Sequence, residues 1–92
     1  MTLDIQPELV KQISPEFIQA VQKLQQNQDN WDRTILLELY ALVKQATQGD
    51  VNVEQPGMFQ VKDGYRYNAW KSVKGKSQQE AITKFLQLIS NL

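Results

Sequence analysis

The chain has 92 residues, with ten cationic and ten anionic side chains and a net charge of zero, which is enough for one domain with a hydrophobic core. It has no Cys and no His, which excludes disulfides and thiolate zinc sites and removes the commonest general base and metal ligand. No segment reaches the roughly 18 apolar residues needed to span a bilayer, so we expect a soluble, cytoplasmic protein without membrane insertion.

The first predicted helix begins at Ser14-Pro15-Glu16, where a capping hydroxyl precedes Pro at the first helical position and an anion in the first turn. Its apolar residues recur at the spacing of one helix face and are Phe17, Ala20, Val21 and Leu24. The polar run 25–30 ends this helix in a loop. We therefore divide the chain into an N-terminal extension, residues 1–13, and one domain, residues 14–92.

A second helix is expected to start near residues 30–32 and to run to about Gln48, with Gly49 as its left-handed cap. Tyr40 and Lys44 lie one turn apart on the same face of this helix, at the edge of its apolar side. A flat amphipathic ring beside a cation suits a ligand that carries a phosphate, an aromatic base and an apolar tail. On spacing alone, a partly buried Tyr beside a solvated Lys is the better explanation.

The apolar residues of segment 49–64 show no helical periodicity. Within it, Gln55-Pro56-Gly57-Met58 has the composition of a type II turn with Pro and Gly at its centre. Loops of about 15 residues are uncommon in compact domains. An extended connection of that length reaches about 45 Å, whereas a helix of roughly 16 residues is about 24 Å long. The loop can therefore return along the second helix, so that the third helix runs in the same direction as the second.

Two further helices are predicted. The third covers about Tyr65 to Val73, and the fourth opens with Ser77 and Glu80 at the spacing of a capping box. The fourth helix then repeats apolar residues on one face, namely Ile82, Phe85, Leu86 and Ile89. No strand pattern competes, so the sequence predicts an all-α fold of four helices.

Charge is distributed unevenly along the chain. From residue 62 onward there are six cations and two anions, whereas the first 61 residues carry four cations and eight anions. A basic segment on a neutral protein indicates a local anion site more than a general polyanion surface. Rings and cations interleave between Tyr65 and Lys76, as they do where bases stack. However, the spacing of Tyr67 and Trp70 places at least one of them in the core, so we expect no nucleic-acid ligand.

Catalytic signatures are absent from the sequence. Gly75-Lys76-Ser77 is similar to the end of a phosphate-binding loop, but Trp70 stands where that motif requires Gly. There is no nucleophile elbow, paired-carboxylate signature or metal-ligand cluster. Asp50 and Glu54 in the long loop are better explained as turn-capping or salt-bridging groups. We therefore expect a protein that is not an enzyme and holds no cofactor and no metal.

Three motifs occur together: K-Q-A-T-x-G-D over residues 44–50, P-G-M-F over 56–59 and A-W-K-x-x-K-G over 69–75. With these motifs the chain resembles the acyl-CoA-binding protein family, without gaps from about Phe17 to the end of the fourth helix. The resemblance implies a four-helix bundle in up-down-down-up order, with a long overhand loop between helices 2 and 3. This order agrees with the argument from loop length.

The resemblance also implies a monomeric carrier or buffer that binds medium- and long-chain acyl-CoA thioesters one to one and shields the acyl chain in a groove between helices. Tyr40 and Lys44 match positions that hold the ribose 3′-phosphate and flank the adenine, and Arg66 matches a Lys that contacts phosphate. The ligand-binding residues expected by position are Tyr40, Ala41, Leu42, Val43, Lys44, Arg66, Phe85, Gln25, Phe17, Ala20 and Val21.

This chain departs from the family pattern at three of these positions. Phe85 stands where the family usually has Tyr, Val43 replaces a common Tyr, and Gln25 occupies a position that is often basic. Each loss lowers the expected affinity by about 0.5–1.5 kcal/mol without a change of ligand class. Because each shielded methylene contributes about 0.8 kcal/mol, binding should strengthen with acyl length. An alternative stays open, namely an interaction module for protein or nucleic acid on the same fold with a vestigial acyl site.

Overall fold

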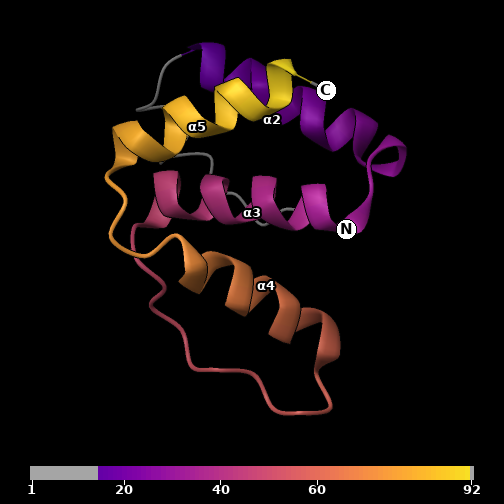
Figure 1. Cartoon of the computed structure of the whole chain (residues 1–92), viewed down its shortest axis with the longest axis vertical. Coiled ribbons are helices and arrows are strands. Elements are labelled where there is room, and N and C mark those ends of the chain that lie inside the picture. Colours follow the sequence, from indigo (N-terminus) through magenta and orange to yellow (C-terminus); the bar gives the residue numbers. More distant parts are fainter. Residues whose placement is uncertain (1–14, 92) are drawn as a thin grey trace.

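The computed structural model describes residues 15–91, which form four α-helices and one short 3₁₀ helix (Figure 1). The elements are α2 Pro15–Asn27, η1 Gln28–Asn30, α3 Arg33–Gln48, α4 Val61–Ser72 and α5 Gln78–Ser90. No strand occurs within the described range, which confirms the all-α prediction. The predicted extension, residues 1–13, and the predicted cap at Ser14 lie outside the described residues.

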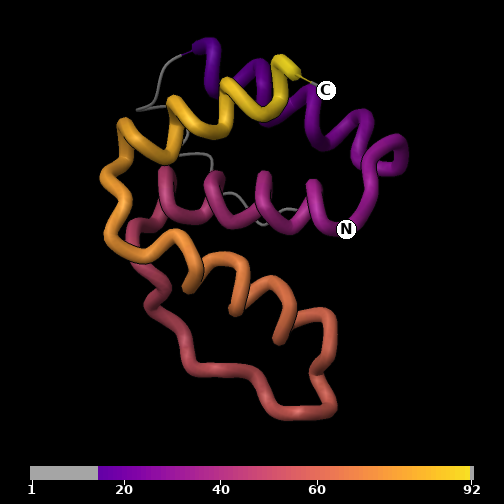
Figure 2. Tube along the Cα trace, in the orientation of Figure 1, coloured from indigo at the N-terminus to yellow at the C-terminus, as the bar shows by residue number. Residues whose placement is uncertain are grey.

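The helices follow the up-down-down-up order. In Figure 1, α2 and α5 cross the molecule in one direction, and α3 and α4 cross it in the other. Figure 2 shows the connection of residues 49–60, which leaves the carboxyl end of α3, runs back along the molecule and enters α4 at its amino end. A chain of that length reaches about 40 Å when extended, which exceeds the roughly 24 Å length of α3. The long loop therefore makes neighbouring helices parallel, as the sequence predicted.

The core lies on the side of α3 that faces α2 and α5. Helix α3 is central, with α5 packed on one side and α4 on the other, and its residues 41–47 are all buried. The core side chains are Phe17, Val21, Leu24, Leu39, Leu42, Val43, Ala46, Ala81, Ile82, Phe85 and Ile89. The fully buried rings of Phe17 and Phe85 meet with centroids 5.2 Å apart and planes tilted by 59°. This contact joins α2 to α5 with a geometry that aromatic pairs prefer.

The predicted helix caps are present where the structure describes them. The Asp32 carboxylate accepts a hydrogen bond from the Ile35 amide at 3.0 Å and starts α3. Gly49 follows α3 with a φ of 79°, a conformation that favours glycine. Ser77 and Glu80 form the full capping box of α5, with both reciprocal hydrogen bonds at 3.1 Å. These local signals were sufficient because each cap involves residues close together in sequence.

The predicted start of the third helix was wrong by four residues. Helix α4 begins at Val61 and not at Tyr65, so Gly64 lies within its first turn. The Gly64 amide donates to the Gln60 carbonyl at 2.9 Å, which makes it an ordinary helical residue. Asp63 supplies an anion in the first turn, where it complements the helix dipole. A glycine near a helix start does not end the helix when its amide finds a partner.

The predicted type II turn over residues 55–58 was also wrong. That turn requires a positive φ at Gly57, whereas positive φ among the described glycines occurs at Gly49 and Gly75. The turn lies two residues later, where the Gln60 amide donates to the Gly57 carbonyl at 2.9 Å. The Gln60 side-chain oxygen accepts in return from the Gly57 amide at 3.1 Å. The Gln60 side chain therefore stabilises the turn at this position.

A network that we call the α3 clamp, formed by Gln45, Asp50, Gly75 and Lys76, fixes the turn between α4 and α5. The Asp50 Oδ1 atom accepts from Gln45 Nε2 and from the Gly75 amide, both at 2.8 Å. Gln45 Nε2 also donates to the Lys76 carbonyl at 2.9 Å. The clamp thus attaches the α4–α5 turn to the carboxyl end of α3.

The clamp favours the ionised form of Asp50. The hydrogen bond from the Gly75 amide, followed by that from Gln45 and by the nearby charge of Lys74, lowers the pKa of Asp50 below 3.8. A carboxylate with a lowered pKa in the folded state stabilises the fold fully above its unfolded pKa. That contribution is lost as the pH falls through the folded pKa.

We therefore expect Asp50→Asn to lower the melting temperature at neutral pH, and the difference from the wild type to shrink as the pH falls below about 3.8. Thermal melts followed by circular dichroism across this range measure the difference directly. Glu54→Gln, in the same loop and exposed, is the matched control and should change stability little at any pH. A difference for Asp50→Asn that stays constant with pH would contradict a role for the charge.

Candidate ligand-binding site

A cluster of cations and rings lies between α3 and α4. Lys44 Nζ is 5.7 Å from the centroid of the Tyr40 ring and 5.7 Å from that of Trp70. Arg66 Cζ lies 6.0 Å from the Tyr40 centroid. These distances are those of cation–π contacts. The predicted residues Tyr40, Lys44 and Arg66 are therefore brought together, with Trp70 added to them.

The parallel arrangement of α3 and α4 positions this cluster. Tyr40 and Lys44 are one turn apart on α3, and Arg66 and Trp70 are one turn apart on α4. The indole Nε1 of Trp70 donates to the Gly49 carbonyl at 2.8 Å and fixes the end of α4 to the end of α3. The long loop therefore has to deliver α4 in this direction before the four side chains can meet.

The cluster lines a hollow of about 410 Å³, which we call the cationic hollow. Its walls come from α3, α4 and the long loop and comprise Tyr40, Lys44, Gln48, Val53, Pro56, Asp63, Arg66, Tyr67 and Trp70. Two apolar loop residues thus face two cations and three rings. A flat group with an attached anion fits such a lining.

The two cations of the cationic hollow differ in their surroundings. Lys44 is only 7 % exposed, so its charge lies among the rings of Tyr40 and Trp70. The Arg66 Nη1 atom lies 3.8 Å from a carboxylate oxygen of Asp63, while the buried Nε atom of Arg66 has no hydrogen-bond partner. A guanidinium with one edge paired keeps other donors for an anion.

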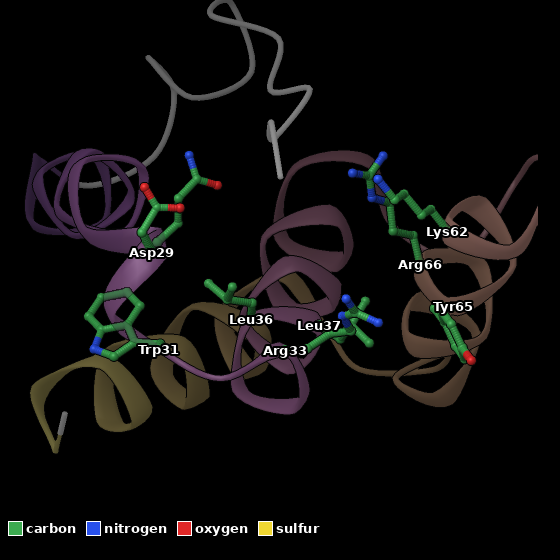
Figure 3. Close-up of a pocket in the computed structure, with 9 residues that line it drawn as sticks. Asp29, Trp31, Arg33, Leu36, Leu37, Lys62, Tyr65 and Arg66 are labelled. Carbon is green, nitrogen blue, oxygen red and sulfur yellow. The ribbon is translucent and has the colours of Figure 1, made fainter.

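A second hollow of about 340 Å³, which we call the interhelical groove, crosses α3 (Figure 3). Leu36 and Leu37 lie in its middle, Trp31 and Asp29 lie on one side, and α4 residues line the other side. The full lining is Gln28, Asp29, Trp31, Arg33, Leu36, Leu37, Lys62, Tyr65 and Arg66. Arg66 lines both hollows, so the two hollows adjoin at this side chain.

The other predicted site residues do not line either hollow. Six of them lie in the core with no more than 4 % exposure, and they are Phe17, Val21, Ala41, Leu42, Val43 and Phe85. Ala20 is half-buried and packs against the core, and Gln25 is exposed on α2. In this conformation the six buried side chains offer no surface to a ligand. Their assignment to the ligand site therefore stays a prediction from the family resemblance.

Several lining residues were missed by sequence reasoning. Tyr67 and Trp70 belong to the run of rings and cations on the third helix, and Trp70 is 3 % exposed, as expected for at least one of the pair. Leu36 is half-buried, packs against the core and also lines the groove. No sequence signal marked Trp31, because its place in the groove depends on how it packs against the core.

Known proteins are similar to this chain in sequence and fold. Residues 14–89 match the family described as Acyl CoA binding protein. The acyl-CoA-binding protein of Saccharomyces cerevisiae is 43 % identical over 84 residues, which cover 91 % of this chain and 93 % of that protein. The acyl-CoA-binding protein of Brassica napus is 40 % identical over 83 residues, which cover 90 % of this chain and 87 % of that protein.

The same relationship holds for a solved structure. The crystal structure of Oryza sativa Acyl-CoA-Binding Protein 2 has a TM-score of 0.79 and 39 % identity, covering 84 % of this chain and 86 % of that one. The chain belongs to the acyl-CoA-binding protein family. Within residues 15–91, no helix has the length and apolarity to cross a bilayer, and no three His, Cys, Asp or Glu side chains form a metal site.

The Trp70 anchor generates a prediction about stability. Trp70→Phe keeps a ring beside Lys44 but removes the donor to the Gly49 carbonyl, so we expect a loss of about 1–2 kcal/mol in the free energy of unfolding. Urea denaturation measures this loss. The matched control is Trp31→Phe, in the chain's other indole, which should cost less. Equal losses in both variants would attribute the effect to ring size and not to the hydrogen bond.

Proposed function

We propose that this chain binds medium- and long-chain acyl-CoA thioesters one to one and serves as a cytoplasmic, monomeric carrier without catalysis. The observation that carries the proposal is the position of Arg66, which lines both the cationic hollow and the interhelical groove. A ligand with a phosphorylated nucleotide at one end and an apolar chain at the other can occupy both. Membership of the family and the names of its relatives support the same ligand class.

The nucleotide end is assigned to the cationic hollow. Lys44 and Arg66 supply charges for the 3′-phosphate, and Tyr40 and Trp70 supply ring faces for the adenine. A hydrogen bond to a charged group contributes about 1.5–3 kcal/mol. Because Asp63 contacts only one edge of the Arg66 guanidinium, the remaining donors can bind phosphate oxygens. In this proposal these groups bind and orient the ligand.

The acyl end is assigned to the interhelical groove. Leu36, Leu37 and Trp31 provide an apolar floor and side, and the cations of Lys62 and Arg66 stand along the α4 side. Each methylene shielded from water contributes about 0.8 kcal/mol. A chain of a dozen carbons therefore adds more than one charged contact, even after the cost of ordering it. Free CoA should accordingly bind more weakly than the thioester.

A second candidate function, binding of a protein partner, is favoured by one surface. Met58 and Phe59, in the turn that precedes α4, are 83 % and 92 % exposed, which is unusual for adjacent large apolar residues. Such a pair can contribute to a protein interface whether or not the acyl site is used. Strong, salt-dependent binding of oligonucleotides without acyl-CoA binding would instead favour a nucleic-acid module.

Titration calorimetry with palmitoyl-CoA, free CoA and palmitate tests the proposed function. We expect the thioester to bind tightest, since it alone fills both hollows, and free CoA to bind weakly. Equal affinities for all three ligands would indicate that the two hollows are not used together. Absence of binding to palmitoyl-CoA would overturn the proposal.

Lys44→Met tests the assignment of the headgroup. Methionine keeps the apolar stem that is buried between Tyr40 and Trp70 but removes the charge, so we expect palmitoyl-CoA binding to weaken by about tenfold to hundredfold with little change in melting temperature. Calorimetry and thermal melts measure the two quantities. Lys23→Met, on the exposed face of α2, is the matched control and should leave affinity unchanged. An unaltered dissociation constant for Lys44→Met would remove Lys44 from the site.

A further inference from the structure

Trp31 stands at the end of the interhelical groove that is opposite α4. In Figure 3 its indole lies beyond Leu36 on the far side of α3 from Lys62, Tyr65 and Arg66. An acyl chain that enters the groove at Arg66 and crosses over Leu36 and Leu37 therefore reaches the indole of Trp31 last. The groove has an apolar floor in its middle and a large ring at its end.

The backbone around Trp31 holds the indole in place. Trp31 is the single residue between η1 and the Asp32 cap of α3, with an extended φ of −118° and ψ of 149°. The hydrogen bond from the Ile35 amide to Asp32, at 3.0 Å, fixes the residue that follows. The indole also packs, half-buried, against the core cluster. Displacing the ring would therefore disturb both the start of α3 and the core.

The other end of the groove is fixed as well. Arg66 lines both hollows, so a headgroup bound in the cationic hollow sets the point at which an attached chain enters the groove. The path of the acyl chain across α3, from the α4 side of the groove to Trp31, is about one helix diameter long, roughly 10–12 Å. An extended chain advances about 3.5 Å for every three single bonds, so this crossing holds about nine or ten methylenes.

We infer that Trp31 limits the acyl-chain length that the groove shelters, and thereby determines the specificity of this chain among acyl-CoA thioesters. The inference rests on the proposed function, because it requires the headgroup to be bound in the cationic hollow. Each methylene that the groove shields from water tightens binding by about three- to fourfold, whereas a methylene that extends past the indole remains in water and adds little. Affinity should therefore rise with chain length and then level off.

The test is a series of dissociation constants for octanoyl-, dodecanoyl-, palmitoyl- and stearoyl-CoA with the wild type and Trp31→Ala. For the wild type we expect affinity to rise from octanoyl to dodecanoyl and to change by less than about threefold from dodecanoyl to stearoyl. For Trp31→Ala we expect stearoyl-CoA to bind at least about tenfold tighter than dodecanoyl-CoA, with octanoyl-CoA unchanged. Trp31→Leu, which keeps apolar contact with the core, should show the same trend in smaller measure.

The control variant is Phe59→Ala, which removes an aromatic side chain that is 92 % exposed and lies outside both hollows, and it should reproduce the wild-type series. Identical chain-length profiles for the wild type and a folded Trp31 variant would overturn the inference and leave the proposed function intact. A loss of affinity equal for all four thioesters would also overturn it, because Trp31 would then only support the fold. Failure of the wild type to bind any of them would overturn the proposed function itself.

Discussion

The side-chain amide of Gln45 holds the centre of this structure together, because it attaches two segments, the start of the long loop and the α4–α5 turn, to the carboxyl end of α3. Its nitrogen donates to Asp50 in the long loop and to the Lys76 carbonyl in the α4–α5 turn. Gln45 is only 2 % exposed, and a buried amide without such partners would cost about 1–3 kcal/mol. The position of the α4–α5 turn is thus tied to the burial of one polar residue.

This attachment helps to determine the geometry of the candidate site between α3 and α4. With the end of α4 fixed by the α3 clamp and by the bond from Trp70 to Gly49, the long loop is left to return the start of α4 along α3. Parallel α3 and α4 then present side chains at the same height, and the cations of Lys44 and Arg66 meet the Tyr40 ring. An antiparallel pair joined by a short turn would place the same residues at opposite ends.

The residues that the family resemblance assigns to the ligand site fall into two groups in the structure, those that line a hollow and those that are buried in the core. Residues that face α4 line the cationic hollow, whereas Val43 and Phe85, which replace common tyrosines, lie in the core at 1 % and 0 % exposure. The Phe85 ring packs on Phe17 with centroids 5.2 Å apart, so an apolar side chain suits its surroundings. Apolar side chains at these two positions therefore accompany a well-packed core, and the proposed site has Tyr40, Lys44 and Arg66 as its polar groups.

The sequence by itself determined the number and order of the helices, the start of α3 near residues 30–32, the caps at Gly49 and Ser77, and the Tyr40–Lys44 pair. The caps and this pair depend on contacts within about one helical turn. The sequence also indicated parallel α3 and α4, since loop length limits reach. Only the tertiary structure decided that Trp70 joins the cations and that Trp31 closes the groove. Both depend on which elements pack together, and helical spacing shows which side chains share a face but not how deeply that face is buried.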